Sequence, residues 1–156
     1  MIRYFFILLF ILCPIIGYAS DENEKLQAIE ALIQKHGLDN VMQQFIAHEH
    51  EQLPIKKDKL DTITSVMYVK STKAKIYKHV LTPGWEKIIS DMTEVSTQDA
   101  KQYMPGLMQQ QLANSICSNK LNQIYLKHGA KIVNVYSDAD GNELFTTTVK
   151  QSDCGV

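Results

Sequence analysis

The chain contains almost no arginine, and this absence removes one class of function at the outset. Arg3 is the single arginine among 156 residues, and beyond the first nineteen residues 15 lysines face 17 acidic residues. Nucleic-acid binding usually needs a net basic face with guanidinium groups that grip phosphates, so we expect no nucleic-acid partner. Glycine and proline are also few, at seven and four, whereas hydrophobic residues make up 45% of the chain. These proportions exclude a disordered or collagen-like chain and predict one compact domain.

The longest uncharged hydrophobic run lies at the N-terminus. Residues 4–16 carry no charge, one arginine precedes them, and small residues stand at Gly17 and Ala19. This arrangement is typical of a secretory signal peptide over residues 1–19. We therefore expect the leader to be cleaved and residues 20–156 to form a single exported domain, in the periplasm or outside the cell.

Two other interpretations of this N-terminal run are weaker. A membrane anchor needs about 20 apolar residues, whereas this segment ends after Ile16 and is broken by Pro14. Lipidation at Cys13 would need a small residue before the cysteine, where Leu12 stands. The prediction is cleavage, with no stable membrane insertion afterwards.

Two cysteines follow the leader, Cys117 and Cys154, and they allow one intramolecular disulfide. Export to an oxidising compartment favours that bond. By the chain-entropy account, closing this loop stabilises the folded domain by about 4 kcal/mol. The alternative, a redox or metal pair, lacks a C-x-x-C spacing and a histidine at ligand spacing. We predict a structural disulfide, no metal site and no cofactor.

Hydrophobic periodicity divides the rest of the chain into helices and strands. Apolar residues at three- and four-residue steps predict helices, and stretches rich in Val, Ile, Thr and Tyr predict strands. Residues 20–52 are expected to form a helical hairpin that turns at Gly37 and ends before Pro54. The remaining elements are expected as strands at 62–69 and 75–81, a short helix or an ordered loop at 85–92, helices at 97–117 and 119–128, and strands at 132–136 and 143–149.

The order of these elements predicts an α+β fold. Two β-hairpins would give a four-stranded antiparallel sheet with helices packed on one face, preceded by the helical hairpin. Cys117 ends the long predicted helix and Cys154 follows the last predicted strand. The disulfide would therefore tie the last strand to the helix that covers the sheet, and residues 53–156 would form a disulfide-closed α+β part.

The densest group of candidate metal ligands is the run His48-Glu49-His50-Glu51. On a helix His48 and His50 point about 200° apart, so they cannot bind one ion together. The zinc-protease spacing would need a histidine where Gln52 stands. The sequence predicts a solvated helix end, with an adventitious or partner-linked metal site as the alternative.

A second acidic group resembles the start of a calcium loop. It consists of Asp138, Asp140 and Asn142, but position twelve, which must be a bidentate acid, is Val149. A turn is therefore predicted there. The chain also lacks a Gly-x-Ser-x-Gly motif, a phosphate loop and a dinucleotide fingerprint.

Four further residues stand alone as candidates. We predict structural roles for His36, His79 and His128, because none has a partner at catalytic or ligand spacing. Trp85 follows Pro83-Gly84 in a loop context, where burial against the sheet is the favoured interpretation and partner binding is the alternative.

The order of features from Leu53-Pro54 onward resembles a group of small exported bacterial proteins. Its motifs are Asp61-Thr62, Tyr77, Cys117-Ser118-Asn119, Gly129, Val135-Tyr136, Asp140-Gly141 and Ser152-Asp153-Cys154. This order is similar to the domain of the quorum-sensing-regulated secreted virulence factor type. The stretch from Thr82 to Val95 is longer here and carries the tryptophan. The resemblance implies a disulfide-closed domain of the envelope or of secreted proteins, with an association with virulence, and it supplies no catalytic residue.

Two functional hypotheses follow. The first is a non-enzymatic exported domain that binds a protein or an envelope component, because export, a disulfide and two hairpins come without a catalytic motif. The second is a periplasmic hydrolase or metal-dependent enzyme whose residues meet only in the fold. Its candidates are His48, His50, Glu51, His79 and His128.

Overall fold

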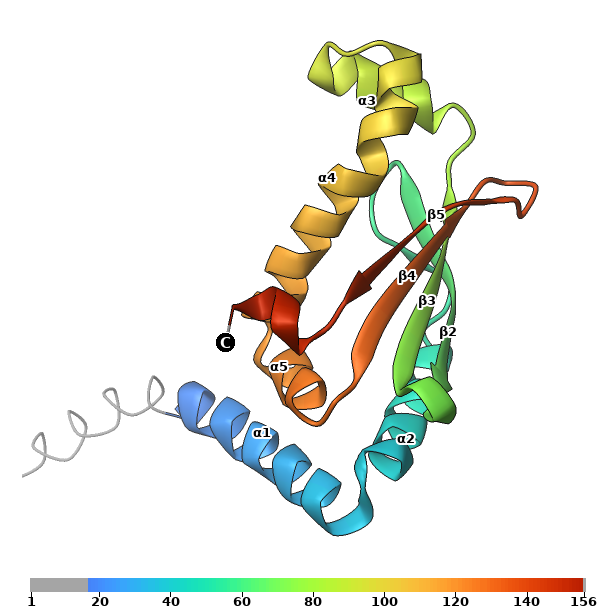
Figure 1. Ribbon diagram of the computed structural model, residues 1–156. Coiled ribbons are helices and arrows are strands. Elements are labelled where there is room, and N and C mark those ends of the chain that lie inside the picture. The colour runs from blue at the N-terminus through green and yellow to red at the C-terminus, as the bar shows by residue number, and fades with distance from the viewer. Residues whose placement is uncertain (1–16, 156) are drawn as a thin grey trace, which may run out of the picture.

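A computed structural model describes residues 17–155 of the chain (Figure 1). The predicted signal peptide falls largely on residues 1–16, which lie outside the described residues, so its cleavage stays a prediction. The helices are α1 (Gly17–His36), α2 (Leu38–His50), α3 (Trp85–Thr93), α4 (Thr97–Ser118) and α5 (Lys120–Lys127). The strands are β1 (Ile55–Lys56), β2 (Asp61–Val69), β3 (Ala74–Leu81), β4 (Lys131–Ser137) and β5 (Glu143–Val149). Short 3-10 turns lie at η1 (Lys70–Thr72) and η2 (Gln151–Cys154).

Side-chain caps mark the first turns of α4 and α5. The Ser96 hydroxyl accepts a hydrogen bond from the backbone N–H of Asp99 and caps α4, and the side chain of Asn119 caps α5 in the same way. Gly37 separates α1 from α2 with a φ of 81°, a left-handed value that glycine adopts without strain.

Among the helices of the described part, none is long and apolar enough to span a membrane.

The sheet differs from the predicted one. Its five strands lie in the order β1-β2-β3-β4-β5, and β3 pairs with β4 in parallel, with Ala74 opposite Lys131. The prediction of a four-stranded antiparallel sheet is therefore wrong, although the α+β class is present and both expected hairpins form.

The length of α4 explains the parallel pair. Its 22 residues span about 33 Å, more than the roughly 26 Å of the eight-residue β3. In Figure 1, α4 runs back along the sheet from the far end of β3. The chain thus re-enters the sheet at the end where β3 began, and β4 must run in the same direction as β3.

The sequence also missed the edge strand β1. Only Ile55 and Lys56 form it, and they pair with Ile63 and Thr62 of β2. Two residues are too few to show a period, so this strand is set by its pairing with β2 rather than by its own pattern.

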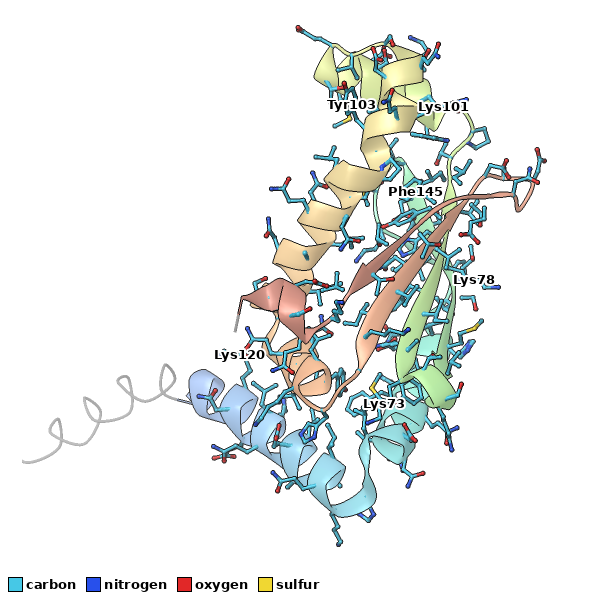
Figure 2. The ribbon with its side chains drawn as sticks, viewed as in Figure 1. Lys73, Lys78, Lys101, Tyr103, Lys120 and Phe145 are labelled. Carbon is cyan, nitrogen blue, oxygen red and sulfur yellow. A yellow bond between two sulfur atoms is a disulfide. The ribbon has the colours of Figure 1, made fainter. Side chains whose placement is uncertain are left out.

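The sheet has an inner face turned toward α4 and an outer face without a helix over it (Figure 1). Lys78 of β3 lies on the outer face in Figure 2, whereas its neighbours Tyr77 and His79 are turned inward. Buried apolar side chains form three clusters. One joins α1 and α2 to α5, one joins α3 and the start of α4 to the sheet, and one lies where α4, α5, β4 and β5 meet.

The two cysteines are bonded in the structure. Cys117, in the last turn of α4, forms a disulfide with Cys154 in η2, and their Cα atoms lie 5.2 Å apart. Both cysteines pack against the cluster that contains Ile116, Leu126 and Val149. The bond therefore joins the C-terminal end of α4 to the segment that follows β5.

Candidate functional site

A cleft of about 350 Å³ lies between the inner face of the sheet and α4, and we call it the α4 cleft. Most of its apolar lining is aliphatic and comes from β1, β2, β4 and α4. The aliphatic side chains are Ile55, Ile63, Leu112, Ile116 and Ile132. Its polar lining comes from the C-terminal end of α2 and from the segment that follows β1. Further polar residues come from β3, from β4, from α4 and from α5. These residues are Glu49, Gln52, Lys57, Tyr77, His79, Ser115, Asn122 and Asn134. An apolar hollow with a few convergent polar groups is the usual form of a binding site.

The cleft is open because α4 is held to the opposite edge of the sheet. The side-chain amide of Gln109 donates to the carbonyl oxygen of Thr148 at 2.8 Å and accepts from its N–H at 3.0 Å. Among the strands, α4 makes its main contact with β5. The inner faces of β2 and β3 therefore meet the cleft rather than a closely packed helix.

A chain of three polar side chains crosses the floor of the cleft. His79 is 4% exposed, and its Nδ1 lies 2.8 Å and 2.9 Å from the two carboxylate oxygens of Asp61. Its Nε2 lies 3.1 Å from the Oδ1 of Asn134, and its ring stacks on Tyr136 with centroids 4.4 Å apart. Both ring nitrogens are engaged by protein groups, so His79 has no nitrogen left to activate a hydroxyl or bind a metal.

A second polar group lies at the end of the cleft near α2. Glu49 accepts hydrogen bonds from Lys75 Nζ at 2.5 Å and from the hydroxyl of Tyr77 at 3.2 Å. Lys75 is 3% exposed, and this burial lowers its pKa while the bond to Glu49 acts in the opposite direction. Burial likewise raises the pKa of Tyr77 above its usual range. The charges of Glu49 and Lys75 compensate each other, whereas the side chain of Lys57 is exposed to solvent.

Some buried polar atoms on and beside the inner face have no hydrogen-bond partner among the described residues. They are the Nδ2 of Asn134, the Oγ1 of Thr147 and the hydroxyl oxygens of Tyr125 and Tyr136. Leaving a buried donor or acceptor unpaired costs about 1–3 kcal/mol. Of these residues, Asn134 lines the cleft.

The structure does not bring the predicted enzyme candidates together in the cleft. His48 and Glu51 lie 3.5 Å apart, but both are exposed at the end of α2, as is His50. His128 pairs with Glu30 of α1 at 2.9 Å. His79 alone of the five named candidates lines the cleft. Within residues 17–155, no three His, Cys, Asp or Glu side chains gather closely enough to hold a metal ion.

Trp85 is buried at the start of α3. It is 5% exposed and packs in the cluster that contains Leu81, Met104 and Tyr136. The exposed apolar side chains near this end are Met92 of α3 and Tyr103 of α4, and Figure 2 labels the latter. The role of Trp85 in partner binding stays a prediction.

Sequence reasoning named His79 but missed its partners Asp61 and Asn134. A signal for Asn134 was present, because it is the one amide inside the apolar run Ile132–Tyr136 and faces the same side as its two buried ends. No signal linked it to His79, since the two residues are 55 positions apart and meet only through the parallel pairing of β3 with β4.

Comparisons with known proteins concern the fold. No protein-family model matches the chain, and no curated protein matches its sequence. A crystal structure of a Pseudomonas aeruginosa protein thought to be secreted is similar, with a TM-score of 0.59 and 13% identity over 75% of this chain and 92% of that one. This similarity shows a shared fold. It does not confirm the resemblance to the quorum-sensing-regulated secreted virulence factor type.

Two pilotins are more weakly similar. They are EpsS from the type 2 secretion system of Vibrio vulnificus, at 14% identity over 85% of this chain and 96% of that chain, and AspS from the type II secretion system of Vibrio cholerae, at 16% over 85% and 98%. Both have a TM-score of 0.47. The structural relative with the higher score thus shares its fold with this chain and is thought to be secreted.

Proposed function

We propose that this chain is an exported, non-enzymatic domain that binds a segment of a partner protein in the α4 cleft. The observation that carries the proposal is the cleft itself, an open apolar hollow whose floor holds an unsatisfied amide. Ligand pockets usually combine apolar walls with a few placed polar groups, and the α4 cleft has this composition.

The polar groups of the cleft favour binding over catalysis. A general base must have a free nitrogen or oxygen within reach of a substrate proton. The two nitrogens of His79 are taken by Asp61 and Asn134, and the carboxylate of Glu49 is taken by Lys75 and Tyr77. These groups hold the floor of the cleft in place.

Two further features support export and a role in the envelope or outside the cell. The N-terminal run has the form of a signal peptide, and the disulfide between Cys117 and Cys154 suits an oxidising compartment. The partner is accordingly a protein of the periplasm, the envelope or the surroundings of the cell.

Site-specific photocrosslinking in the producing cells tests this function. A benzoylphenylalanine at Ser115, an exposed residue that lines the cleft, should give one discrete covalent adduct. The same group at Asn114, which is exposed on α4 but does not line the cleft, should give none. The adduct is identified by mass spectrometry. An absent adduct at Ser115, or an equal one at Asn114, would contradict the proposal.

A blocking variant sharpens the experiment. With the crosslinker at Gln52, which also lines the cleft, Ser115→Trp should reduce the adduct to roughly a tenth or less, because the indole occupies space that the bound segment needs and a loss of about 1.4 kcal/mol is tenfold in affinity. Asn114→Trp is the matched control and should leave the adduct unchanged.

A further inference from the structure

We infer that the α4 cleft recognises a peptide group next to an aliphatic side chain, with Asn134 as the residue that reads the peptide group. This inference rests on the function proposed above and names the chemistry of the bound segment. It is carried by the buried amide of Asn134, by the aliphatic walls around it and by the pairing of the nearby charges.

Asn134 is built into the floor of the cleft with half of its amide unused. The residue is 4% exposed and lines the cleft, and its Oδ1 faces the Nε2 of His79 at 3.1 Å. Its Nδ2 has no partner among the described residues. Thr147 lies opposite Asn134 on β5, but it makes no hydrogen bond to this Nδ2, since the Oγ1 of Thr147 is also without a partner among the described residues. The Nδ2 atom itself is enclosed, so a ligand pairs with it only by displacing a neighbouring side chain.

Either orientation of the Asn134 amide favours the same ligand. With Oδ1 toward His79, the free atom is the Nδ2 donor, which needs a carbonyl oxygen. With the amide turned, Nδ2 donates to His79 Nε2 and the free atom is the Oδ1 acceptor, which needs an N–H. A secondary amide offers both groups, so a peptide unit satisfies Asn134 in each case.

The rest of the cleft selects what accompanies the peptide group. Leu112 and Ile116 of α4 face the cleft together with Ile132 of β4, and branched aliphatic walls suit an aliphatic side chain. The buried charges are paired, Glu49 with Lys75 and Asp61 with His79, so they do not select a charged ligand. The charge of Lys57 lies on an exposed side chain of the lining. A segment that contains leucine, isoleucine or valine fits the aliphatic walls.

A titration with two small probes tests the inference. The protein is produced from its full-length sequence, and its methyl groups and asparagine side chains are followed by NMR as N-acetylleucine methylamide or N-acetylglycine methylamide is added. The leucine probe should shift the methyl signals of Leu112, Ile116 and Ile132 and the side-chain signal of Asn134. It should bind roughly tenfold more tightly than the glycine probe, because only the leucine side chain can be buried.

Variants separate the amide from the aliphatic walls. Asn134→Leu removes both amide atoms and should weaken the leucine probe roughly three- to tenfold. Ser115→Trp should abolish binding, and Asn114→Trp should leave it intact. If Asn134→Leu does not fold, the Asn134 side-chain signal of the parent decides, because it must move on addition of the leucine probe.

Three results would overturn the inference: equal affinity for both probes, an unmoved Asn134 signal, or full affinity of a folded Asn134→Leu variant. If the crosslink at Ser115 forms while the leucine probe fails, the proposed function stands and this inference falls. If the crosslink is also missing, both fall.

Discussion

The two halves of the inner sheet face are built from different chemistry. Over β5, α4 is held by the Gln109 amide, by the disulfide and by an apolar cluster around Leu126 and Val149. Over β2, β3 and the middle of β4, the floor consists of paired polar side chains such as Lys75 and His79, and the α4 cleft is open above them. The closed half supplies stability, and the open half holds its buried polar side chains in fixed pairs.

Breaking the disulfide tests the closed half and should have the largest effect on stability. Replacing Cys117 and Cys154 by serine should lower the free energy of unfolding by about 4 kcal/mol, because the unfolded chain regains the freedom of a loop of 37 residues. The melting temperature should fall by roughly 10–20 °C.

Thermal unfolding followed by circular dichroism, with and without a reducing agent, measures this change. The reduced parent should melt like the serine variant, and the variant should not respond to the reductant. A parent that melts within a degree or two of the variant would show that the closed half does not depend on the bond.

Removing one member of a buried ion pair tests the open half. Glu49→Ala leaves the charge of Lys75 uncompensated at 3% exposure, and we expect a loss of about 3 kcal/mol in urea unfolding. Adding Lys75→Met should restore stability to within about 1 kcal/mol of the parent, because the buried charge is then gone.

Glu51→Ala is the matched control, two residues after Glu49 and just beyond the end of α2. Glu51 is exposed, so the change should stay within about 0.5 kcal/mol. If Glu49→Ala behaves like this control, the polar floor of the open half is not held by its ion pair.

The smallest effect is expected outside both halves, where α1 meets α5. The hydrogen bond from His128, assisted by Lys127, lowers the pKa of Glu30 below its usual value of 4.5. A carboxyl group with a lowered pKa in the folded state adds stability above its unfolded pKa, and that stability is lost as the pH falls through the folded value. Glu30→Gln should therefore cost less than about 1 kcal/mol at pH 6.

Urea unfolding of parent and variant from pH 6 down to pH 3 measures this dependence. The two stability curves should converge at the acidic end. A constant gap between them would show that the charge of Glu30 is not what joins α1 to α5.

The individual elements could be predicted well from the sequence. The expected strand at 62–69 is β2 and that at 75–81 is β3, and the long expected helix at 97–117 is α4 to within one residue. These elements have enough residues for their hydrophobic period to appear, and their ends carry capping or turn residues. The two-residue β1 has neither, so it was missed.

The candidate site could not be predicted in the same way. His79 and Asn134 belong to strands whose positions along the chain were predicted correctly, but no sequence pattern indicated that the two residues lie side by side. Their contact depends on the parallel pairing, which follows from the direction in which α4 returns along the sheet. The period of a strand shows which residues share a face, and it does not show which strand lies next to it.

By itself, the sequence determined the longer helices and strands of this protein, its slightly acidic charge with a single arginine, and one possible cysteine pair beyond residue 19. These properties depend on local periodicity and on counting. The tertiary structure decided the parallel joining of the hairpins and the opening of the α4 cleft. It also decided that both nitrogens of His79 are taken while one atom of Asn134 is free. Such features arise when residues far apart in the chain are packed together, because hydrogen-bond partners are assigned by distance in space.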